Sequence, residues 1–371
     1  MRVGVPKEIK VEEYRVGLTP ASVREYVAHG HEVVVQQGAG EGIGAGDDAY
    51  RQAGARIADT AEEVFSVAEM IVKVKEPQPS EWTRLREGQI LFTYLHLAPD
   101  VPQTKGLIGS GCTAVAYETV TDAHGGLPLL APMSEVAGRL AIEAAGAALR
   151  KSADGMGKLL GGVPGVPPAR VAIIGGGVVG THAARMAAGL GSDVTILDRS
   201  LPRLRVLDDI FLGRVRTRYA TLEAIEQEII AADVVIGAVL VPGASAPKLV
   251  SRAQLGSMKR RAVLVDVAID QGGCFETSKP TTHQAPTYLV DDIVHYCVAN
   301  MPGAVPVTSS HALNHATLPF GLALASKGLR ALVEDPHLRV GLNVHRGRIT
   351  NRAVAESQHL AVVMPEEALA S

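Results

Sequence analysis

The sequence predicts an α/β protein built from two doubly wound parallel-sheet domains. Three observations carry this prediction. Short aliphatic strands alternate with helical segments in both halves of the chain, a pattern typical of βαβ units. A segment with five glycines and three prolines, residues 155–168, interrupts the alternation and predicts a hinge or loop. The length of 371 residues fits two domains of about 150 residues each.

The first alternation fills roughly the first 130 residues. Thr19-Pro20 predicts a helix start, with Thr19 as the N-cap, and Gly30 predicts the end of that helix. A second helix is predicted over 47–54. The predicted strands are 2–5, 32–36, 70–75, 89–94 and 113–118.

An Ala-rich helix predicted over 136–150 leads into the second alternation. Its predicted strands are 171–174, 194–198, 216–219, 234–238, 262–267 and 295–298, and its helices 180–190, 222–231 and 251–256. A further long helix is predicted over 313–333. We expect the C-terminal tail to pack on the first domain, which gives a discontinuous domain of residues 1–131 and 306–371 and a second domain of residues 132–305.

The amino-acid composition argues against several classes of protein. Because 36 basic and 39 acidic residues give a net charge of −3, a nucleic-acid or membrane-surface partner is not expected. Hydrophobic residues make up 47% of the chain, enough for large cores. The three widely spaced cysteines form no CxxC pair, which argues against a disulfide framework or a zinc site and favours the reducing cytosol. No apolar run suggests a signal peptide or a membrane helix.

Residues 175–180, GGGVVG, match the dinucleotide-binding fingerprint G-x-G-x-x-G. They follow an apolar strand and open a helix, so this half is predicted to be a Rossmann domain. Gly175 permits the turn, Gly177 lets the pyrophosphate approach, and Gly180 lets helix and strand pack. Asp198 ends the next strand and would bind the adenosine ribose, which favours NAD over NADP, although Arg199 beside it can tolerate a phosphate. The alternative interpretation of residues 175–180 is a structural glycine turn that binds no cofactor.

Three polar residues of the first domain stand at or just beyond predicted strand ends. Arg15 can clamp a carboxylate, Lys75 can polarise a carbonyl oxygen, and His96 can transfer a proton near neutral pH. Because ligands gather outside the carboxyl ends of parallel strands, these side chains are expected to converge. Taken singly, each has an ordinary structural reading as a loop charge, a solvated strand end or a core histidine.

Two residues of the second domain complete the candidate chemistry. Asp270 is predicted to terminate the apolar strand VLVDVAI, where a buried carboxylate is costly without a task. It would assist the acid/base chemistry, or else cap the turn that follows. Asn300 follows the last strand and would bind the nicotinamide carboxamide. Cys274 and Cys297 are predicted to be small buried residues.

Several long segments resemble the alanine dehydrogenase family: KEIKVEEYRVGLTP, KVKEP, FTYLHLA, LAPMSEVAGR, LGGVPGVPPARVAIIGGGVVG, VDVAIDQGGCFETS and VHYCVANMPGAVP. They extend from residue 7 to about residue 306. The resemblance implies reversible, NAD-dependent oxidative deamination of L-alanine to pyruvate and ammonium by a homohexamer. No metal is expected, because the protein supplies acid/base groups and the cofactor supplies the redox step. The resemblance further implies that Arg15 and Lys75 bind the substrate and that His96 and Asp270 are the acid/base groups.

The resemblance also implies a set of cofactor contacts. Beside the glycines of the fingerprint these are Ser134, Val178, Val179, Asp198, Arg203, Ala220, Val239, Leu240, Val267, Ala268, Ile269, Asp270, Lys279, Val298, Ala299, Asn300 and Met301. The sequence departs from the family pattern at Ala220, where serine is common, and at Lys279 and Val307, where arginine is common.

Three other functions are compatible with such a sequence. One is the NAD-binding part of a transhydrogenase, which would not need the four catalytic candidates. Another is a cofactor-binding regulator without catalysis. The third is a dehydrogenase of a larger amino acid, which resembles saccharopine dehydrogenase.

Overall fold

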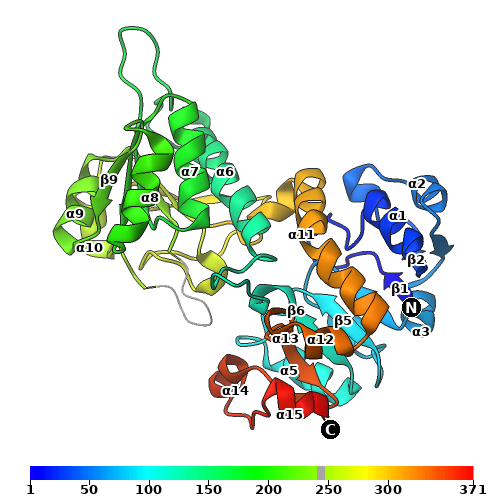
Figure 1. The fold of residues 1–371 in the computed structure, drawn as a ribbon. Coiled ribbons are helices and arrows are strands. Elements are labelled where there is room, and N and C mark those ends of the chain that lie inside the picture. The colour runs from blue at the N-terminus through cyan, green and yellow to red at the C-terminus, as the bar shows by residue number, and fades with distance from the viewer. Residues whose placement is uncertain (240–246, 371) are drawn as a thin grey trace. The chain divides into compact units, whose positions relative to one another are not determined.

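The computed structural model describes residues 1–239 and 247–370 and divides into two compact units. Unit 1 comprises Met1–Met133 and Gly303–Ser371, and unit 2 comprises Ser134–Pro302. Each unit is an α/β sandwich whose sheet is flanked by helices (Figure 1), so the predicted fold class is confirmed. No helix among the described residues is both long and apolar enough to cross a membrane.

Unit 1 contains an eight-stranded sheet in the order β15-β14-β6-β5-β4-β1-β2-β3. Strands β1 to β6 are parallel, and β14 joins β6 antiparallel. Read from β3, the order 3-2-1-4-5-6 is that of a doubly wound sheet whose strand order reverses between β1 and β4. The strands are β1 (Arg2–Val5), β2 (Glu32–Gln36), β3 (Arg56–Ala58), β4 (Met70–Val72), β5 (Ile90–Thr93), β6 (Thr113–Ala116), β14 (Leu342–His345) and β15 (Arg348–Ile349).

Ten helices belong to the described part of unit 1. They are α1 (Pro20–Ala28), α2 (Asp47–Gln52), α3 (Ala61–Val67), α4 (Pro79–Trp82), α5 (Val101–Ser110), α11 (Pro306–Lys327), α12 (Arg330–Glu334), α13 (Pro336–Arg339), α14 (Arg352–Gln358) and α15 (Pro365–Ala370). As predicted, Thr19 caps α1 by accepting the backbone N–H of Ser22, and Pro20 occupies the first turn. Helix α11 packs against α1, where Gly321 lies against Tyr26.

Unit 2 has a seven-stranded sheet in the order β12-β13-β11-β10-β7-β8-β9. Six strands are parallel, and β12 is an antiparallel edge strand. Without β12 the order is again 3-2-1-4-5-6, the order of a dinucleotide-binding sheet. The strands are β7 (Arg170–Ile174), β8 (Asp193–Asp198), β9 (Arg216–Tyr219), β10 (Val234–Gly237), β11 (Val263–Asp266), β12 (Thr287–Val290) and β13 (Ile293–Tyr296).

The helices of unit 2 are α6 (Ala131–Ala148), which begins at the boundary between the units, α7 (Val178–Gly189), α8 (Leu201–Phe211), α9 (Leu222–Ala231) and α10 (Arg252–Leu255). Helices α6 and α7 pack closely because Gly138 lies directly against the backbone of Val179. Segment 155–168 carries no helix or long strand, only a bridge between Val163 and Val166, and it projects from the unit (Figure 1).

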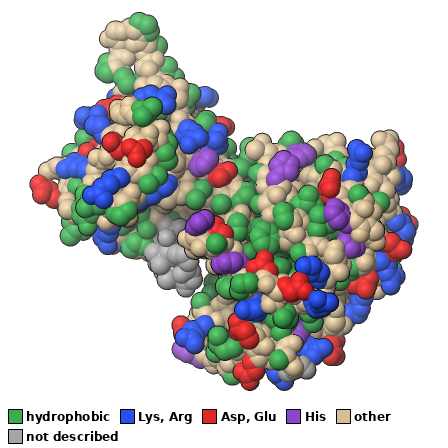
Figure 2. Space-filling model, viewed as in Figure 1, with side chains coloured by type: hydrophobic (Ala, Val, Ile, Leu, Met, Phe, Trp, Pro, Cys, Tyr) green, Lys and Arg blue, Asp and Glu red, His purple; other side chains and the backbone are tan. Residues whose placement is uncertain are grey.

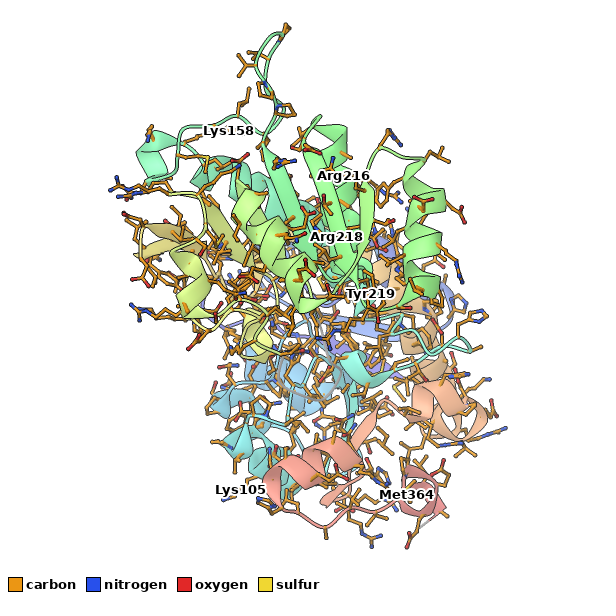
Figure 3. All side chains as sticks on the ribbon, turned by 90° about the vertical axis from the view of Figure 1, so that its left-hand side faces the viewer. Lys105, Lys158, Arg216, Arg218, Tyr219 and Met364 are labelled. Carbon is orange, nitrogen blue, oxygen red and sulfur yellow. The ribbon has the colours of Figure 1, made fainter. Side chains whose placement is uncertain are left out.

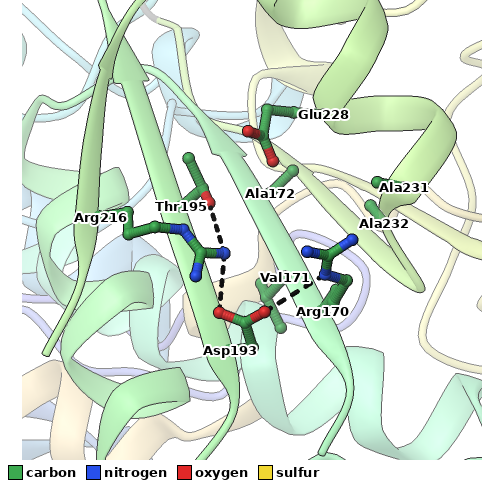
Figure 4. Close-up of a pocket in the computed structure, with 9 residues that line it drawn as sticks. All are labelled: Arg170, Val171, Ala172, Asp193, Thr195, Arg216, Glu228, Ala231 and Ala232. Atoms are coloured by element: carbon green, nitrogen blue, oxygen red, sulfur yellow. Dashed lines mark hydrogen bonds and ion pairs between the residues drawn. The ribbon is translucent and has the colours of Figure 1, made fainter.

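The edge strand β9 carries two charged side chains, Arg216 and Arg218, at alternate positions (Figure 3). Charged residues on an edge strand disfavour its pairing with a strand of another molecule. Arg216 pairs with Asp193, and Arg218 pairs with Glu228. Asp193 also accepts a hydrogen bond from Arg170 (Figure 4). This charge cluster lines a hollow of only about 10 Å³ at the start of β7 and β8, at the opposite sheet end from where ligands bind doubly wound folds.

The structure corrects several predicted boundaries. Strand β4 ends at Val72, so Lys75 lies in the loop that follows, and β5 ends at Thr93. Strand β11 ends at Asp266, so Asp270 does not terminate a strand. The sequence pattern does not predict β3, β12, β14 and β15, which are short or lie at or beside a sheet edge.

Candidate active site

The polar residues of unit 1 follow the carboxyl ends of neighbouring parallel strands. Arg15 lies in the loop after β1, Lys75 and Glu76 after β4, His96 after β5, and Glu118 after β6. Strands β1 and β4 are adjacent in the sheet, at the point where the strand order reverses. This is the position at which open α/β sheets bind their ligands.

Arg15 is held by an acidic neighbour that the sequence analysis did not single out. The Glu13 carboxylate accepts Arg15 Nε at 2.7 Å and Nη2 at 2.5 Å, and both side chains are buried. Burial lowers the pKa of the Arg15 guanidinium, but the hydrogen bonds and charge of Glu13 outweigh burial and raise it. Arg15 Nη1 contacts Sδ of Met133 at 3.0 Å. The guanidinium is therefore charged and fixed in orientation.

Helix α11 holds the loop that carries Arg15. The side chain of Asn314 accepts the backbone N–H of Thr19 at 2.8 Å, and the hydroxyl of Ser310 accepts that of Val16 at 3.3 Å. These bonds connect residues almost 300 positions apart in the chain, which explains why no local pattern predicts them.

Lys75 and His96 meet at the carboxylate of Glu76. Glu76 Oε1 lies 2.7 Å from His96 Nδ1 and 3.7 Å from Lys75 Nζ, and its Oε2 accepts Lys10 Nζ at 2.7 Å. Burial raises the pKa of the Glu76 carboxyl, but the bond with His96 and the charges of Lys75 and Lys10 hold it well below its usual range. Glu76 is thus an ionised centre that brings two sequence-predicted residues together.

His96 has the exposure and the surroundings of a proton-transfer group. Its side chain is 40% exposed, and its ring stacks on Tyr94 with 5.7 Å between ring centroids. Burial of the imidazole lowers its pKa, but Glu118 and Glu76 outweigh this effect and raise it. The signal that identifies Glu76 in the sequence is its place directly after Lys75 in KVKEP.

A second, fully buried ion cluster supports the same edge of the sheet. Lys73 Nζ lies 2.9 Å from Glu8 and 2.8 Å from Glu81, and all three side chains are at most 2% exposed. Glu8 also accepts the backbone N–H of Val74 at 2.7 Å. Because Val74 directly precedes Lys75, this cluster fixes the start of the loop that carries Lys75 and Glu76.

In unit 2 the fingerprint glycines have the geometry that a dinucleotide needs. Gly175 has a φ of +108°, and a Cβ there would lie 2.6 Å from the carbonyl oxygen of Ala238. A Cβ on Gly180 would overlap the carbonyl oxygen of Gly175. A Cβ on Gly177, by contrast, would meet no atom within 4 Å, so the backbone there is open to a ligand. Gly177 caps α7 without a side-chain hydrogen bond, as at phosphate-binding helix N-termini.

Asp198 and Arg203 lie beside the glycine turn. Asp198 Oδ2 accepts the backbone N–H of Gly176 at 2.7 Å. Arg203 donates from Nε to the carbonyl of Gly176 at 2.5 Å and from Nη2 to Thr181 Oγ1 at 2.6 Å. Ala220 donates its backbone N–H to the carbonyl of Asp198. The predicted adenosine-side residues therefore form one group.

The remaining predicted cofactor contacts divide by position. Val178 and Val179 begin α7, Val239 follows β10, and Ser134 lies one helical turn before Gly138, which packs on α7. The segments 267–270 and 298–301 follow β11 and β13 at the same edge of the sheet. Lys279 instead lies over the ring of Tyr288 in the edge strand β12, beside an open hollow of about 530 Å³. Leu240 lies outside the described residues.

The buried carboxylate that the sequence analysis assigned to Asp270 belongs to Asp266. Asp270 is exposed, four residues beyond the strand. Asp266 is wholly buried and accepts the backbone N–H groups of Ala268 at 3.1 Å and Cys274 at 2.8 Å, and the Ser278 hydroxyl. Burial raises the pKa of Asp266, and this effect is larger than the opposite effect of the hydrogen-bond donors. Asp266 thus shapes the loop on which Asp270 stands.

Basic and acidic side chains are interspersed over the face drawn in Figure 2, in keeping with the net charge of −3. All three cysteines are buried, and burial raises the pKa of each thiol, so they are poor nucleophiles.

Comparisons with known proteins agree with this geometry. The alanine dehydrogenase/PNT N-terminal domain matches residues 4–137, and the C-terminal domain matches residues 141–352. An alanine dehydrogenase from Halomonas elongata is 60% identical over 98% of both chains. A solved L-alanine dehydrogenase superimposes with a TM-score of 0.94 at 50% identity, covering 97% of this chain and 99% of that one.

A solved transhydrogenase from Sinorhizobium meliloti has a TM-score of 0.81 at 24% identity and covers 95% of this chain and 100% of its own. That likeness shows a common fold. The family matches and the close relatives go further: this chain belongs to the alanine dehydrogenase/PNT family.

Proposed function

We propose that this protein is an NAD-dependent alanine dehydrogenase. The reaction converts L-alanine, NAD⁺ and water to pyruvate, ammonium, NADH and a proton, and it is reversible. The observation that carries the proposal is the meeting of Lys75 and His96 at the Glu76 carboxylate, on the ligand-binding edge of unit 1. The 60% identity to an alanine dehydrogenase supports the choice of substrate.

Arg15 and Lys75 are the proposed substrate anchors. A guanidinium and an ammonium group placed on adjacent loops attract the carboxylate of an amino acid. Glu13 keeps the guanidinium charged and fixed in orientation, which reduces the entropy lost when the substrate binds. Correct orientation of the substrate can lower the reaction barrier by several kcal/mol.

The glycine turn of unit 2 is the proposed NAD site. Gly177 leaves room for a pyrophosphate at the start of α7, and the Asp198 carboxylate stands beside the turn, where a ribose would lie. Its negative charge disfavours a 2′-phosphate and so favours NAD over NADP. Bound NAD would supply the redox step by accepting a hydride from Cα of the substrate.

His96 and Asp270 are the proposed acid/base groups. Alanine first releases a proton from its ammonium group to solvent; loss of hydride from Cα then leaves an iminium, which water attacks to form a carbinolamine. In this direction His96 takes a proton from the attacking water and gives it to the amino nitrogen, and Asp270 takes the hydroxyl proton as the C–N bond breaks and passes it to the departing ammonia, which leaves as ammonium. In the reverse direction His96 returns the proton.

The first experiment measures NADH formation by its ultraviolet absorbance with L-alanine and NAD. Glycine, L-serine and a larger amino acid replace alanine in parallel, and NADP replaces NAD. We expect rapid NADH formation with alanine and NAD, and a loss of at least about a hundredfold in His96→Asn. Tight NADH binding without turnover of any amino acid would contradict the proposal and favour a transhydrogenase-like or regulatory role.

We also propose that the protein works as a cytoplasmic homohexamer, as the family resemblance implies. Light scattering coupled to size-exclusion chromatography measures the mass in solution. A mass of six chains is the expected result, and a monomer would contradict it.

A further inference from the structure

Two carboxylates hold His96 from opposite ends of the residue. Glu118 Oε1 accepts the backbone N–H of His96 at 2.6 Å and lies 3.2 Å from that of Leu95. Glu76 Oε1 lies 2.7 Å from the ring atom Nδ1. One carboxylate therefore fixes the main chain and the other fixes the imidazole.

The backbone of His96 needs such support. Its φ of +47° lies in the left-handed region, which a residue with a Cβ adopts only at an energetic cost. The two N–H groups of Leu95 and His96 both point at Glu118, which stabilises this turn. His96 follows β5 and Glu118 follows β6, so the two strands together fix the position from which the imidazole extends.

The bond to Glu76 determines the protonation pattern of the ring. An ionised carboxylate can only accept hydrogen bonds, so Nδ1 of His96 must carry a proton. In the neutral imidazole the lone pair then belongs to Nε2, which becomes the atom that takes and returns a proton. The parallel ring of Tyr94, tilted by 20°, further restricts rotation of the imidazole.

We propose that Glu76 is the positioning residue of the reaction: it fixes the Nδ1–H tautomer of His96, keeps Nε2 as the reactive nitrogen and sets the pH at which the histidine works. The proposal rests on the proposed function, because it names the group that tunes the acid/base residue of the same site. Glu76 acts through His96 and through Lys75, which it also faces at 3.7 Å.

The charges around His96 give the sign of the effect. The groups that face the ring are Glu76 and Glu118, which favour the imidazolium, and Lys75, which opposes it. Lys10 Nζ donates to the other oxygen of Glu76, Oε2. Loss of the Glu76 charge must therefore lower the pKa of His96, because one of the two stabilising carboxylates is gone and Lys75 remains.

The test compares two substitutions in the intact protein. In Glu76→Gln the side chain keeps an oxygen that can accept Nδ1–H but loses the charge, whereas Glu76→Ala loses both. Glu62→Gln is the matched control, since Glu62 forms an exposed ion pair with Arg84 in the same unit. We expect kcat/KM for alanine to fall about tenfold in Glu76→Gln and about a hundredfold in Glu76→Ala, with NADH binding unchanged. Because Glu76 is buried and faces Lys10 and Lys75, Tm should fall in both variants, and activity is therefore compared well below either Tm.

Two pH-dependent readouts distinguish positioning from a merely structural role. The acid limb of the kcat/KM profile should move to lower pH by about one unit in Glu76→Gln. Hydrogen–deuterium exchange at the imidazole carbon of His96, followed by mass spectrometry, should show the same fall in pKa without any turnover. Both values should be unchanged in Glu62→Gln.

An unchanged His96 pKa in Glu76→Gln would overturn the inference. An equal loss of activity in Glu76→Gln and Glu76→Ala, accompanied by weaker NADH binding, would also overturn it. The exchange measurement also separates the two proposals. If the wild-type protein does not oxidise alanine, the proposed function fails, but the His96 pKa still reports whether Glu76 controls the imidazole.

Discussion

The Glu13 carboxylate binds the Nε–Nη2 edge of Arg15 with two hydrogen bonds, at 2.7 and 2.5 Å, and neither side chain is more than 1% exposed. Two residues that are almost adjacent in the chain thus form a buried ion pair at the ligand-binding edge of unit 1. Because the pair lies away from water, its geometry is fixed before any substrate arrives.

Glu13→Gln should therefore destabilise the protein and impair substrate binding. The amide keeps one acceptor oxygen but removes the negative charge that is hydrogen-bonded to the buried guanidinium of Arg15, which costs about 3 kcal/mol. Urea unfolding gives the change in the free energy of unfolding, and steady-state kinetics should show a higher KM for alanine. The exposed variant Glu334→Gln, which loses ion pairs with Lys327 and Arg330, should behave like wild type. Equal effects of the two substitutions would refute this account.

Lys73→Met should produce a stability loss that depends on pH. The substitution leaves the carboxyls of Glu8 and Glu81 buried without their cation, at a cost of at least about 3 kcal/mol at neutral pH. Burial already raises the pKa of Glu8, and the charge of Lys73 opposes this rise more strongly than the hydrogen bond from the Val74 backbone does, so the folded-state pKa rises further in the variant. The folded state then binds protons more tightly than the unfolded chain, and stability is lost as pH rises above the unfolded value.

The measurement is urea unfolding of wild type and Lys73→Met at about pH 5 and about pH 7.5. The deficit of the variant should be smaller at the lower pH. The double variant Lys73→Met with Glu8→Gln should recover part of the loss, since one uncompensated charge is removed. A deficit that does not change with pH would show that packing, not charge, is responsible.

Asp266→Ala should weaken NADH binding although Asp266 is proposed to contact neither cofactor nor substrate. Without its carboxylate, the backbone N–H groups of Ala268 and Cys274 and the Ser278 hydroxyl lose a common acceptor, and the loop that carries Asp270 loosens. Fluorescence titration should show at least about tenfold weaker binding of NADH. Asp292→Ala, which removes an exposed partner of Arg260, serves as the control; binding as weak in that variant would contradict the assigned role.

Gly180→Ala and Gly189→Ala provide a matched pair within α7. A methyl group at position 180 would overlap the carbonyl oxygen of Gly175, so we expect a loss of about 2 kcal/mol or more and much weaker NADH binding. At position 189 no atom lies within 4 Å, and alanine should stabilise the helix by about 0.5–1 kcal/mol. Thermal unfolding and NADH titration check both variants. A tolerated alanine at position 180 would contradict the close packing of helix and strand.

The sequence predicts the parts of this fold that depend on local patterns. Strand β7, the turn 175–177 and the strand that ends at Asp198 form one local pattern, and all lie where the pattern predicts. The edge strand β12 and the tail strands β14 and β15 were missed because an alternation of strands and crossover helices predicts parallel strands, whereas these three strands pair antiparallel with their neighbours.

The candidate site divides in the same way. Arg15, Lys75 and His96 were predicted to be site residues because they follow strands. Glu13, Glu76 and Glu118 were not predicted, because they are acceptors whose partners are defined only in three dimensions. The error at Asp270 has a similar origin. Two aspartates, Asp266 and Asp270, follow each other in VDVAID, and an apolar run does not reveal which of them ends the strand.

The most direct test of the proposed reaction follows the hydrogen on Cα of the substrate. L-Alanine labelled with deuterium at Cα is incubated with unlabelled NAD, and the NADH formed is analysed by mass spectrometry. Hydride transfer from Cα predicts NADH that carries one deuterium, together with slower turnover than with unlabelled alanine when this transfer limits the rate. Alanine labelled only at the methyl group should give unlabelled NADH. Unlabelled NADH from the Cα-labelled substrate, or no NADH at all, would contradict the assignment.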